Sequence, residues 1–520
     1  MAVTKKNRLL VFTIAMALVF SLTTVCLAKG PKYGGTLVQG FGVYPNSLDV
    51  HVASGGSSRV LVSQYNNNLI DSDQEGNLLP GLATSWEFSD PLTLIFHLRK
   101  GVKFQDGTDF NAEAVKYNFE RLAGKTEPKI TSPAKRTAGG FQLIEVVDPY
   151  TVKIKMKGPD AGILSFMHGW FTAMVSPAAV KKWGDKYLFH LTGTGPFILK
   201  KHIPGSQILY EKWDGYWKKD KQGNALPYLD KMKIMIIPDP ATREAALRSG
   251  TIDLDQELTA KHALRLKKDP DIKVITLKGF LTKFLPLNTG KPPMDNVWFR
   301  KAINLAIDRQ EIIASVHQGE GSIPNGFFSP ISWAYDSNLK WYEYNPEKAK
   351  EALKKSGLPE GVSFKAAVYN PQAKAEAEMV QAQLKRVGIN MVIDNVDFAT
   401  FNSQYRRQGL YHAAFTGYPQ TGYDPGFLSF VFHFSKGPYA DPGRPTMYDA
   451  AALQARGAAA GDREKRKEIF AKLHKLVYDN AGEIYLAWTN GYRAHRAYVK
   501  NFKLSADQFS AADEVWLDKK

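Results

Sequence analysis

The stretch LPGLATSWEFSDPLTLIFHLRKGVKFQDGTDFNAEAVKYNFERL, residues 79–122, decides how the rest of the chain is interpreted. A strand with one buried face is predicted where apolar residues occupy every second position, at Leu92, Leu94, Phe96 and Leu98. Asp106-Gly107 then predicts a turn, because glycine tolerates positive φ and aspartate bonds to its own backbone. Asn111 is a good N-cap for a helix whose apolar face holds Val115, Phe119 and Leu122. The local prediction is therefore a strand, a turn and a capped helix.

This order of residues resembles the signature of the family-5 extracellular solute-binding proteins of ABC transporters, which include oligopeptide-, dipeptide- and nickel-binding proteins. The matching pieces of the stretch are Leu82-Ala83, Ser85-Trp86-Glu87, Leu98-Arg99, Gly101–Phe104, Asp106-Gly107 and the helix 112–122. Further pieces follow in the family's order: Thr192–Phe197, Pro238–Leu254, Arg300–Arg309 and Leu384–Ile389. The resemblance covers nearly all of the chain after its amino-terminal segment.

The resemblance implies an α/β fold, namely the two-lobed periplasmic binding protein fold of type II, with hinge-linked lobes and an extra subdomain in the first lobe. The expected divisions are residues 29–278 for the first lobe, 279–488 for the second lobe, and 489–520 for a return to the first lobe. The ligand is expected between the lobes, which close over it by a hinge motion.

Residues 1–28 are predicted to be a cleavable signal peptide. Lys5, Lys6 and Arg8 form a positive start, Leu9–Leu22 is an apolar run, and cleavage is expected after Ala28. The address is therefore periplasmic. Cys26 is the only cysteine, but lipidation is not favoured, because Val25 precedes it where a lipoprotein signal has a small residue. Cleavage after Ala28 would leave a mature chain without a disulfide.

Composition indicates a soluble globular protein, with 44% hydrophobic and 23% charged residues. The aromatic share of 12% fits either a large core or a ligand cleft lined by aromatic residues. The net charge of +17 raises the question of nucleic acid or a membrane surface as partner. However, no run of five Lys or Arg occurs, so a solvated basic surface is preferred and nucleic acid is not expected.

No motif in the chain predicts catalysis. His-Glu-x-x-His, paired-cysteine and Gly-x-Ser-x-Gly patterns are absent, and the 11 histidines are scattered. The glycine-rich turn Thr192–Phe197 lacks the Gly-Lys-Ser/Thr ending of a phosphate-binding loop. We therefore expect a binding protein with no enzymatic activity, no cofactor and no metal site.

Two regions of the first lobe are candidates for the ligand cleft through the resemblance. Tyr44 follows the first predicted strand, and the alternative is an aromatic packed on the surface. Trp170 and Phe171 lie where family members present side chains to the ligand, and the alternative is core packing. Trp488, at the end of the last predicted strand, is expected near the hinge.

The second-lobe candidates surround the segment before Pro425. Peptide-binding relatives carry an Asp four positions before this proline, which pairs with the amino terminus of the peptide, but this chain has Thr421 there. A hydroxyl is a weaker partner for an ammonium than a carboxylate, so ordinary recognition of the amino terminus is in doubt. Arg406 is a candidate for an anionic ligand group, with a solvated or salt-bridged arginine as alternative. Stacking and hydrogen-bond contacts are expected from Phe398, Tyr418 and Gln420.

The function implied is the extracytoplasmic substrate-binding component of an ABC importer, which delivers a peptide or similar small solute to a membrane permease and acts as a monomer. An oligosaccharide or another polar or anionic solute is the alternative ligand. A secreted hydrolase and a basic adhesion protein are weaker alternatives of other classes.

Three predicted elements bear on the site. Val297–Ile313 is expected to be one amphipathic helix, Phe401–Gln408 a further helix, and Tyr418–Pro425 a loop.

Overall fold

The structure is a computed structural model that describes residues 30–44, 47–53, 60–73, 77–130, 132, 135–160, 162–420, 424–426, 428, 463–504 and 512–519. The predicted signal peptide 1–28 and the candidate Thr421 lie outside the described residues. Across the described ranges, no helix combines the length and the apolar character that crossing a membrane would require.

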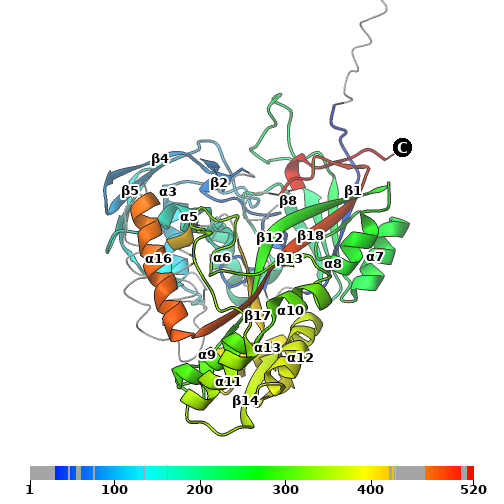
Figure 1. Ribbon diagram of the computed structural model, residues 1–520. Helices are drawn as coiled ribbons and strands as arrows, with labels where there is room; N and C mark the ends of the chain where they lie inside the picture. Colours follow the sequence, from blue (N-terminus) through cyan, green and yellow to red (C-terminus); the bar gives the residue numbers. More distant parts are fainter. Residues whose placement is uncertain are drawn as a thin grey trace, which may run out of the picture.

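The largest sheet has nine strands and runs through the centre of the molecule (Figure 1). Its order is β17-β12-β18-β11-β1-β10-β9-β8, with β13 also paired to β18. The central strand β1 is parallel to β10 and β11, whereas the other pairs are antiparallel. The strands are β1 (Thr36–Phe41), β8 (Phe197–Ile203), β9 (Gln207–Lys212), β10 (Lys231–Ile236), β11 (Leu254–Asp255), β12 (Ile272–Pro286), β13 (Gly321–Ser322), β17 (Thr416–Pro419) and β18 (Glu483–Arg496).

The first part of the chain also contains several short helices. They are α4 (Lys135–Ala138), α5 (Ile163–His168), α6 (Pro177–Trp183), α7 (Pro240–Ser249) and α8 (Ala260–Leu266), with 3-10 turns at Trp170–Thr172 and Gly184–Phe189. Helix α7 shows both capping signals of its sequence. The Asp239 carboxylate accepts from the Thr242 amide at 2.7 Å, and Gly250 ends the helix at φ +77°.

The opening stretch of the sequence forms a separate four-stranded antiparallel sheet, ordered β4-β5-β7-β6. Its elements are β4 (Ala83–Asp90), β5 (Thr93–Leu98), β6 (Phe141–Asp148), β7 (Thr151–Met156) and the helix α3 (Ala112–Leu122), and the hairpin β2 (Ile70–Ser72) with β3 (Leu78–Pro80) precedes it. The local predictions are confirmed. Leu94, Phe96 and Leu98 are buried, Gly107 has φ +85°, and Asn111 Oδ1 accepts from the Ala114 amide at 3.0 Å.

Strands β12 and β18 are the two long connections of the molecule. Near Ile272 they lie beside β11, and near Leu285 they lie beside the second sheet, ordered β15-β14-β16. The second sheet is parallel and is covered by helices (Figure 1). Its elements are α9 (Val297–Ala306), α10 (Arg309–Ser315), α11 (Pro346–Lys355), β14 (Val362–Val368), α12 (Pro371–Lys385), β15 (Ile389–Asn395), α13 (Phe398–Thr400) and β16 (Ala413–Ala414). The α/β architecture with two lobes agrees with the expectation from the sequence.

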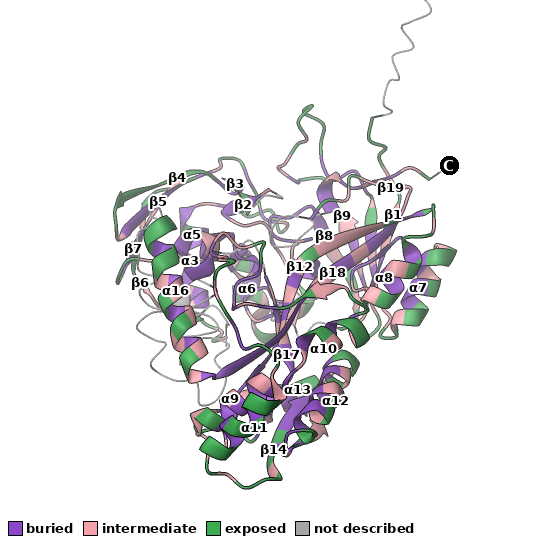
Figure 2. Cartoon of the chain, viewed as in Figure 1, coloured by how far each residue is buried: buried purple, intermediate pink, exposed green. Residues whose placement is uncertain are grey.

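Figure 2 shows buried residues along the strands and exposed residues on the outer faces of α7, α11 and the helix α16 (Arg463–Asn480). One apolar cluster extends from the four-stranded sheet to α16 and contains Phe96, Phe166, Phe327, Tyr418 and Phe470. Side chains from the four-stranded sheet, from the segment around Phe327 and from α16 therefore share one continuous core. The short pair β19 (Val499–Lys500) and β20 (Trp516–Leu517), with a 3-10 turn at Ala512–Glu514, completes the described chain.

Three predicted elements differ from the structure. The helix predicted over Val297–Ile313 is two helices, because the backbone is extended at Ile307 and Asp308 caps α10. Phe401–Arg407 is a π-helix. Tyr418 lies in β17 and not in a loop, because pairing with β12 supplies backbone partners that outweigh the weak strand preference of Gly417 and Pro419.

Candidate functional site

Tyr418 and Gln420 are fixed at the carboxyl end of β17, next to β12. The Tyr418 hydroxyl donates to the Phe327 carbonyl at 3.0 Å. The Gln420 amide Nε2 donates to the same carbonyl at 2.9 Å and to Thr282 Oγ1 at 3.0 Å. Both residues are buried, with 2% and 1% exposed. Their side chains therefore tie β17 to the segment around Phe327, and this contact stiffens the strand end.

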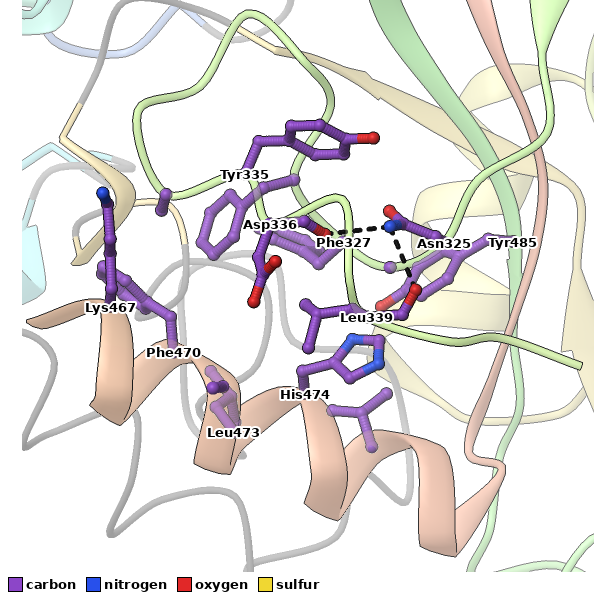
Figure 3. A pocket seen from close by; sticks show the side chains of 15 residues that line it. Asn325, Phe327, Tyr335, Asp336, Leu339, Lys467, Phe470, Leu473, His474 and Tyr485 are labelled. Carbon is purple, nitrogen blue, oxygen red and sulfur yellow. Dashed lines mark hydrogen bonds between the residues drawn. The ribbon is translucent and has the colours of Figure 1, made fainter.

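A cavity of about 250 Å³ lies between residues 325–339 and helix α16 (Figure 3). Asn325 Nδ2 closes the loop by donating to the carbonyls of Asp336 and Leu339 at 2.9 and 3.1 Å. The wall is mostly apolar, and its polar side chains include Asp336, Lys467 and His474. This arrangement suits a partly apolar ligand group with a few polar contacts.

Two of the candidates adjoin this cavity without lining it. The Tyr418 ring stacks on Phe327 at 4.9 Å, and the Trp488 ring meets Tyr335 edge-on at 5.7 Å. The lining residues Phe327, Tyr335 and Phe470 were not among the residues predicted from the sequence. The aromatic pair in PNGFFSP, residues 324–330, was the available signal, but nothing in the sequence shows that this loop faces α16.

A larger cavity of about 560 Å³ is lined by residues from the first part of the chain, among them Trp170, and by residues near its carboxyl end, among them Leu504 and Asp513. The polar wall includes Asp71, His168 and an ion pair between Lys218 Nζ and Asp513 Oδ2 at 3.0 Å. Burial raises the pKa of the Asp71 carboxyl, although the charge of Lys218 opposes this effect. Phe171 does not line the cavity and packs against Trp170 at 5.8 Å. Of these two neighbouring candidates, Trp170 therefore lines the cavity, whereas Phe171 packs behind it.

Tyr44 lies beyond the end of β1 and contacts His202 of β8. Its hydroxyl makes a short hydrogen bond with His202 Nε2, and the rings stack at 5.8 Å with an angle of 9°. Burial raises the pKa of the Tyr44 phenol and lowers the pKa of His202. This pair keeps Tyr44 half-buried, with its ring held against the first lobe.

Phe398 and Arg406 lie in the helical segment after β15. Phe398 is 48% exposed, and its ring packs against Tyr369 at 5.3 Å. The Arg406 guanidinium carbon lies 5.5 Å from the Phe401 ring. Phe398 therefore presents an aromatic surface to solvent, and Arg406 is half-buried on the same segment.

The carboxylate of Asp424 is engaged by the protein itself. Arg466 of α16 donates to both of its oxygens, with Nη1 2.8 Å from Oδ2, and the Asp424 amide donates to Ser165 Oγ at 2.9 Å. Arg466 is 1% exposed. Asp424 therefore has a structural role, as its position next to Pro425 suggested, and it does not replace the carboxylate that position 421 lacks.

The candidates thus occupy separate places: the end of β17 with the cavity beside it, the first-lobe cavity, the Tyr44 contact and the Phe398 segment. Within the parts of the chain that the structure describes, no three His, Cys, Asp or Glu residues come together in a way that could hold a metal ion.

Solved structures with this fold include periplasmic binding proteins. DppA from Helicobacter pylori, an ABC transporter-associated periplasmic binding protein in complex with the peptide STSA, is 27% identical, with a TM-score of 0.84, over 94% of this chain and 99% of that chain. The two-lobed fold with its long connecting strands therefore defines a substrate-binding protein of an ABC importer.

The family follows from the sequence comparison. The model for bacterial extracellular solute-binding proteins, family 5, matches residues 77–439, more than half of the chain. The chain belongs to this family, whose members are extracellular, non-catalytic binding components. Similar relatives include heme-binding protein A of Haemophilus influenzae, 29% identical over 90% of both chains, and the dipeptide-binding protein of Escherichia coli, 29% identical over 82% of this chain and 83% of the relative.

Proposed function

We propose that this substrate-binding protein captures short peptides and delivers them to an ABC permease. The observation that carries the proposal is the position of β17. Among the described strands it pairs with β12 alone, at the end of the nine-stranded sheet. A strand at the end of a sheet can pair its outer edge with an extended peptide, and main-chain hydrogen bonds then supply affinity for many sequences.

Recognition of the peptide backbone fits a chain in which position 421 does not supply a carboxylate for an amino terminus. Thr421 replaces the expected carboxylate. Asp424 is held by Arg466. The amino group of the peptide would then contribute less to the binding affinity than the main-chain hydrogen bonds of the peptide. The names of two relatives, one binding a dipeptide and one solved with a peptide, support the ligand class.

The test is a thermal-shift titration of the purified protein with alanine peptides of two to five residues and their N-acetylated forms. We expect stabilisation by the peptides, and at most a threefold loss of affinity on acetylation, which corresponds to about 0.7 kcal/mol. A hundredfold loss on acetylation would show that an amino terminus is recognised after all. Stabilisation by no peptide at all would reject the peptide assignment.

A second candidate ligand is an anionic or polar non-peptide solute, and Arg406 favours it. The Arg406 residue is half-buried and shares a segment with the exposed Phe398. A planar cation beside an aromatic surface suits a carboxylate carried on an apolar or sugar-like body. Stabilisation by saccharides or carboxylates but by no peptide, together with its loss in Arg406→Met, would establish this alternative.

The remaining parts of the proposal concern the address and assembly of the protein. Export by the segment 1–28, cleavage after Ala28, a periplasmic location and action as a monomer complete it. The amino-terminal sequence of the secreted protein tests the cleavage site directly. A mature start at Lys29 is expected, whereas a lipid-modified Cys26 at the amino terminus would contradict it.

A further inference from the structure

Four polar side chains form a ring beneath the strand on which peptide binding is proposed. Lys283 Nζ donates to Gln372 Oε1 at 3.2 Å, and Gln372 Nε2 contacts His317 Nδ1 at 3.2 Å. His317 Nε2 lies 3.4 Å from Glu376 Oε1, and this oxygen lies 3.7 Å from Lys283 Nζ. The members come from β12, from the residues after α10, and from α12, so the ring joins three separate elements.

The hydrogen bonds assign the protons in the ring. Gln372 accepts from Lys283 through its oxygen, so its amide nitrogen is the group that faces His317. An amide nitrogen only donates, and His317 Nδ1 must therefore accept. The neutral ring of His317 then carries its proton on Nε2, which lies 3.4 Å from Glu376 Oε1 without forming a hydrogen bond to it. A second proton on His317 would remove this acceptor.

Two members of the ring are buried, and one member is exposed to solvent. Glu376 is 1% exposed and His317 is 2% exposed, whereas Gln372 is at the surface. Burial, together with a smaller effect of the Lys283 charge, lowers the pKa of His317 to about 4. Burial raises the pKa of Glu376, and Lys283 opposes that rise. Lys283 is thus the charged side chain that acts on both groups, and protons can reach the ring from the side of Gln372.

The stem of Lys283 connects the ring to β17. Lys283 pairs with Gly417 in the sheet, at a bulge where the register between β12 and β18 shifts. A Cβ added to Gly417 would lie 3.2 Å from Lys283 Cδ and 3.8 Å from Cε. The side chain of Lys283 therefore lies across the middle of β17, where Gly417 leaves room for it. A change in the ring that moves Lys283 must change the support of this strand.

We propose that the Lys283–Gln372–His317–Glu376 ring is a proton-responsive brace, in which Lys283 is a positioning residue for the ligand-binding edge of β17. The role of the brace in ligand binding rests on the proposed function. The effect of the brace on β17 is independent of that function. The brace is complete when His317 is neutral. Acid places a second charge beside Lys283 in a buried site, so the ring opens and β17 loses its support.

The direction of the pH effect follows from the two buried groups. Because its pKa is lowered in the closed ring, neutral His317 stabilises the closed ring against opening. This stabilisation is complete above about pH 6.5 and is lost as the pH falls toward about 4. Glu376 contributes in the opposite sense, since its pKa is raised in the ring. If the ring opens fully, the contribution of His317 at pH 5 is at most about thirtyfold in the opening equilibrium.

Hydrogen exchange of the amides in residues 416–420, corrected for intrinsic rates, tests the brace without any ligand. At pH 7 we expect Lys283→Met to lower protection at least tenfold, because it keeps the apolar stem and removes the ammonium. Lys374→Met is the matched control. Lys374 lies on α12, the helix that carries Gln372 and Glu376, and it forms an exposed ion pair with Glu378 at 3.8 Å. Equal protection in the two variants would overturn the proposal.

Two further variants test the proton. His317→Gln keeps a donor and an acceptor but does not titrate, so protection at pH 7 should match the wild type and the fall at pH 5 should disappear. Glu376→Gln removes the opposing contribution, and the fall should steepen. A purely structural ring would instead show the same pH profile in His317→Gln as in the wild type, and that result would overturn the proposal.

Binding of tri-alanine, measured at pH 7 and pH 5, then separates this proposal from the peptide assignment. If both hold, its affinity follows the protection of residues 416–420 in each variant. If tri-alanine does not bind while the exchange pattern is as expected, the brace stands and tri-alanine is not a ligand. Binding that stays constant while protection changes would overturn the role of Lys283 in ligand binding.

Discussion

At the scale of single residues, a buried ion pair joins Arg121 of α3 to Asp49. Arg121 donates to both oxygens of Asp49, at 2.6 and 3.1 Å, and to His51 Nδ1 at 2.8 Å. Burial alone would raise the pKa of Asp49, but the Arg121 guanidinium lowers it. Burial and the same guanidinium lower the pKa of His51 to about 3. Since His51 stays neutral, Asp49 depends on Arg121 for its charge balance.

Arg121→Met should therefore destabilise the protein by about 3–5 kcal/mol, because it leaves a buried carboxylate without a partner. Lys103→Met is a suitable control, because its pair with Asp109 at 2.7 Å is exposed and should contribute less than about 1 kcal/mol. Urea unfolding at pH 7 measures both. Similar losses in the two variants would mean that water reaches Asp49 and that the pair is not isolated.

The same scale shows what the sequence could and could not predict about the site. Tyr418, Gln420 and Trp488 were singled out, and the structure places them around the end of β17 and along β18. Their partners Phe327 and Tyr335 were missed, because a contact between residues 91 or more positions apart leaves no local pattern. Lys283 and Glu376 were missed for a related reason, since each resembles an ordinary charged residue until the ring is seen.

At the scale of elements, the hydrophobic periodicity predicted well where helices and strands occur, but it predicted poorly where each of them begins and ends. The helix expected over Val297–Ile313 is two helices, although the apolar face continues through Ala306 and Ile307. The break is set by Asp308, whose carboxylate accepts from the Glu311 amide at 3.0 Å. A capping signal inside an apolar pattern was therefore the better guide to the boundary.

The cap gives a prediction for α10. Asp308→Ala should lower the free energy of unfolding by about 1 kcal/mol, because the first turn of α10 loses the acceptor for its Glu311 amide. Asp295→Ala changes an exposed residue just before α9 and should stay within about 0.5 kcal/mol of the wild type. Urea unfolding again provides the measurement. An unchanged Asp308→Ala would show that tertiary packing alone ends α9.

At the scale of the whole molecule, the fold class followed from motifs that extend over most of the chain, whereas the contacts that hold the two parts together did not. Asp424 donates its amide proton to Ser165 of α5, and Arg466 of α16 holds its carboxylate. Arg466 also lies 5.0 Å from the Trp333 ring. An ion pair and a hydrogen bond of Asp424 thus link the segment after β17 with α16 and α5.

We expect the ion pair between Asp424 and Arg466 to help hold the lobes together. Arg466→Met would leave the Asp424 carboxylate poorly solvated, and the segment would separate from Ser165 to reach water. Small-angle scattering should then give a larger radius of gyration than the wild type without ligand. Arg463→Met, on the same helix and also near Trp333, is the control and should scatter like the wild type. If Arg466→Met also scatters like the wild type, the shared apolar core around Phe327 and Phe470 holds the lobes together without the ion pair.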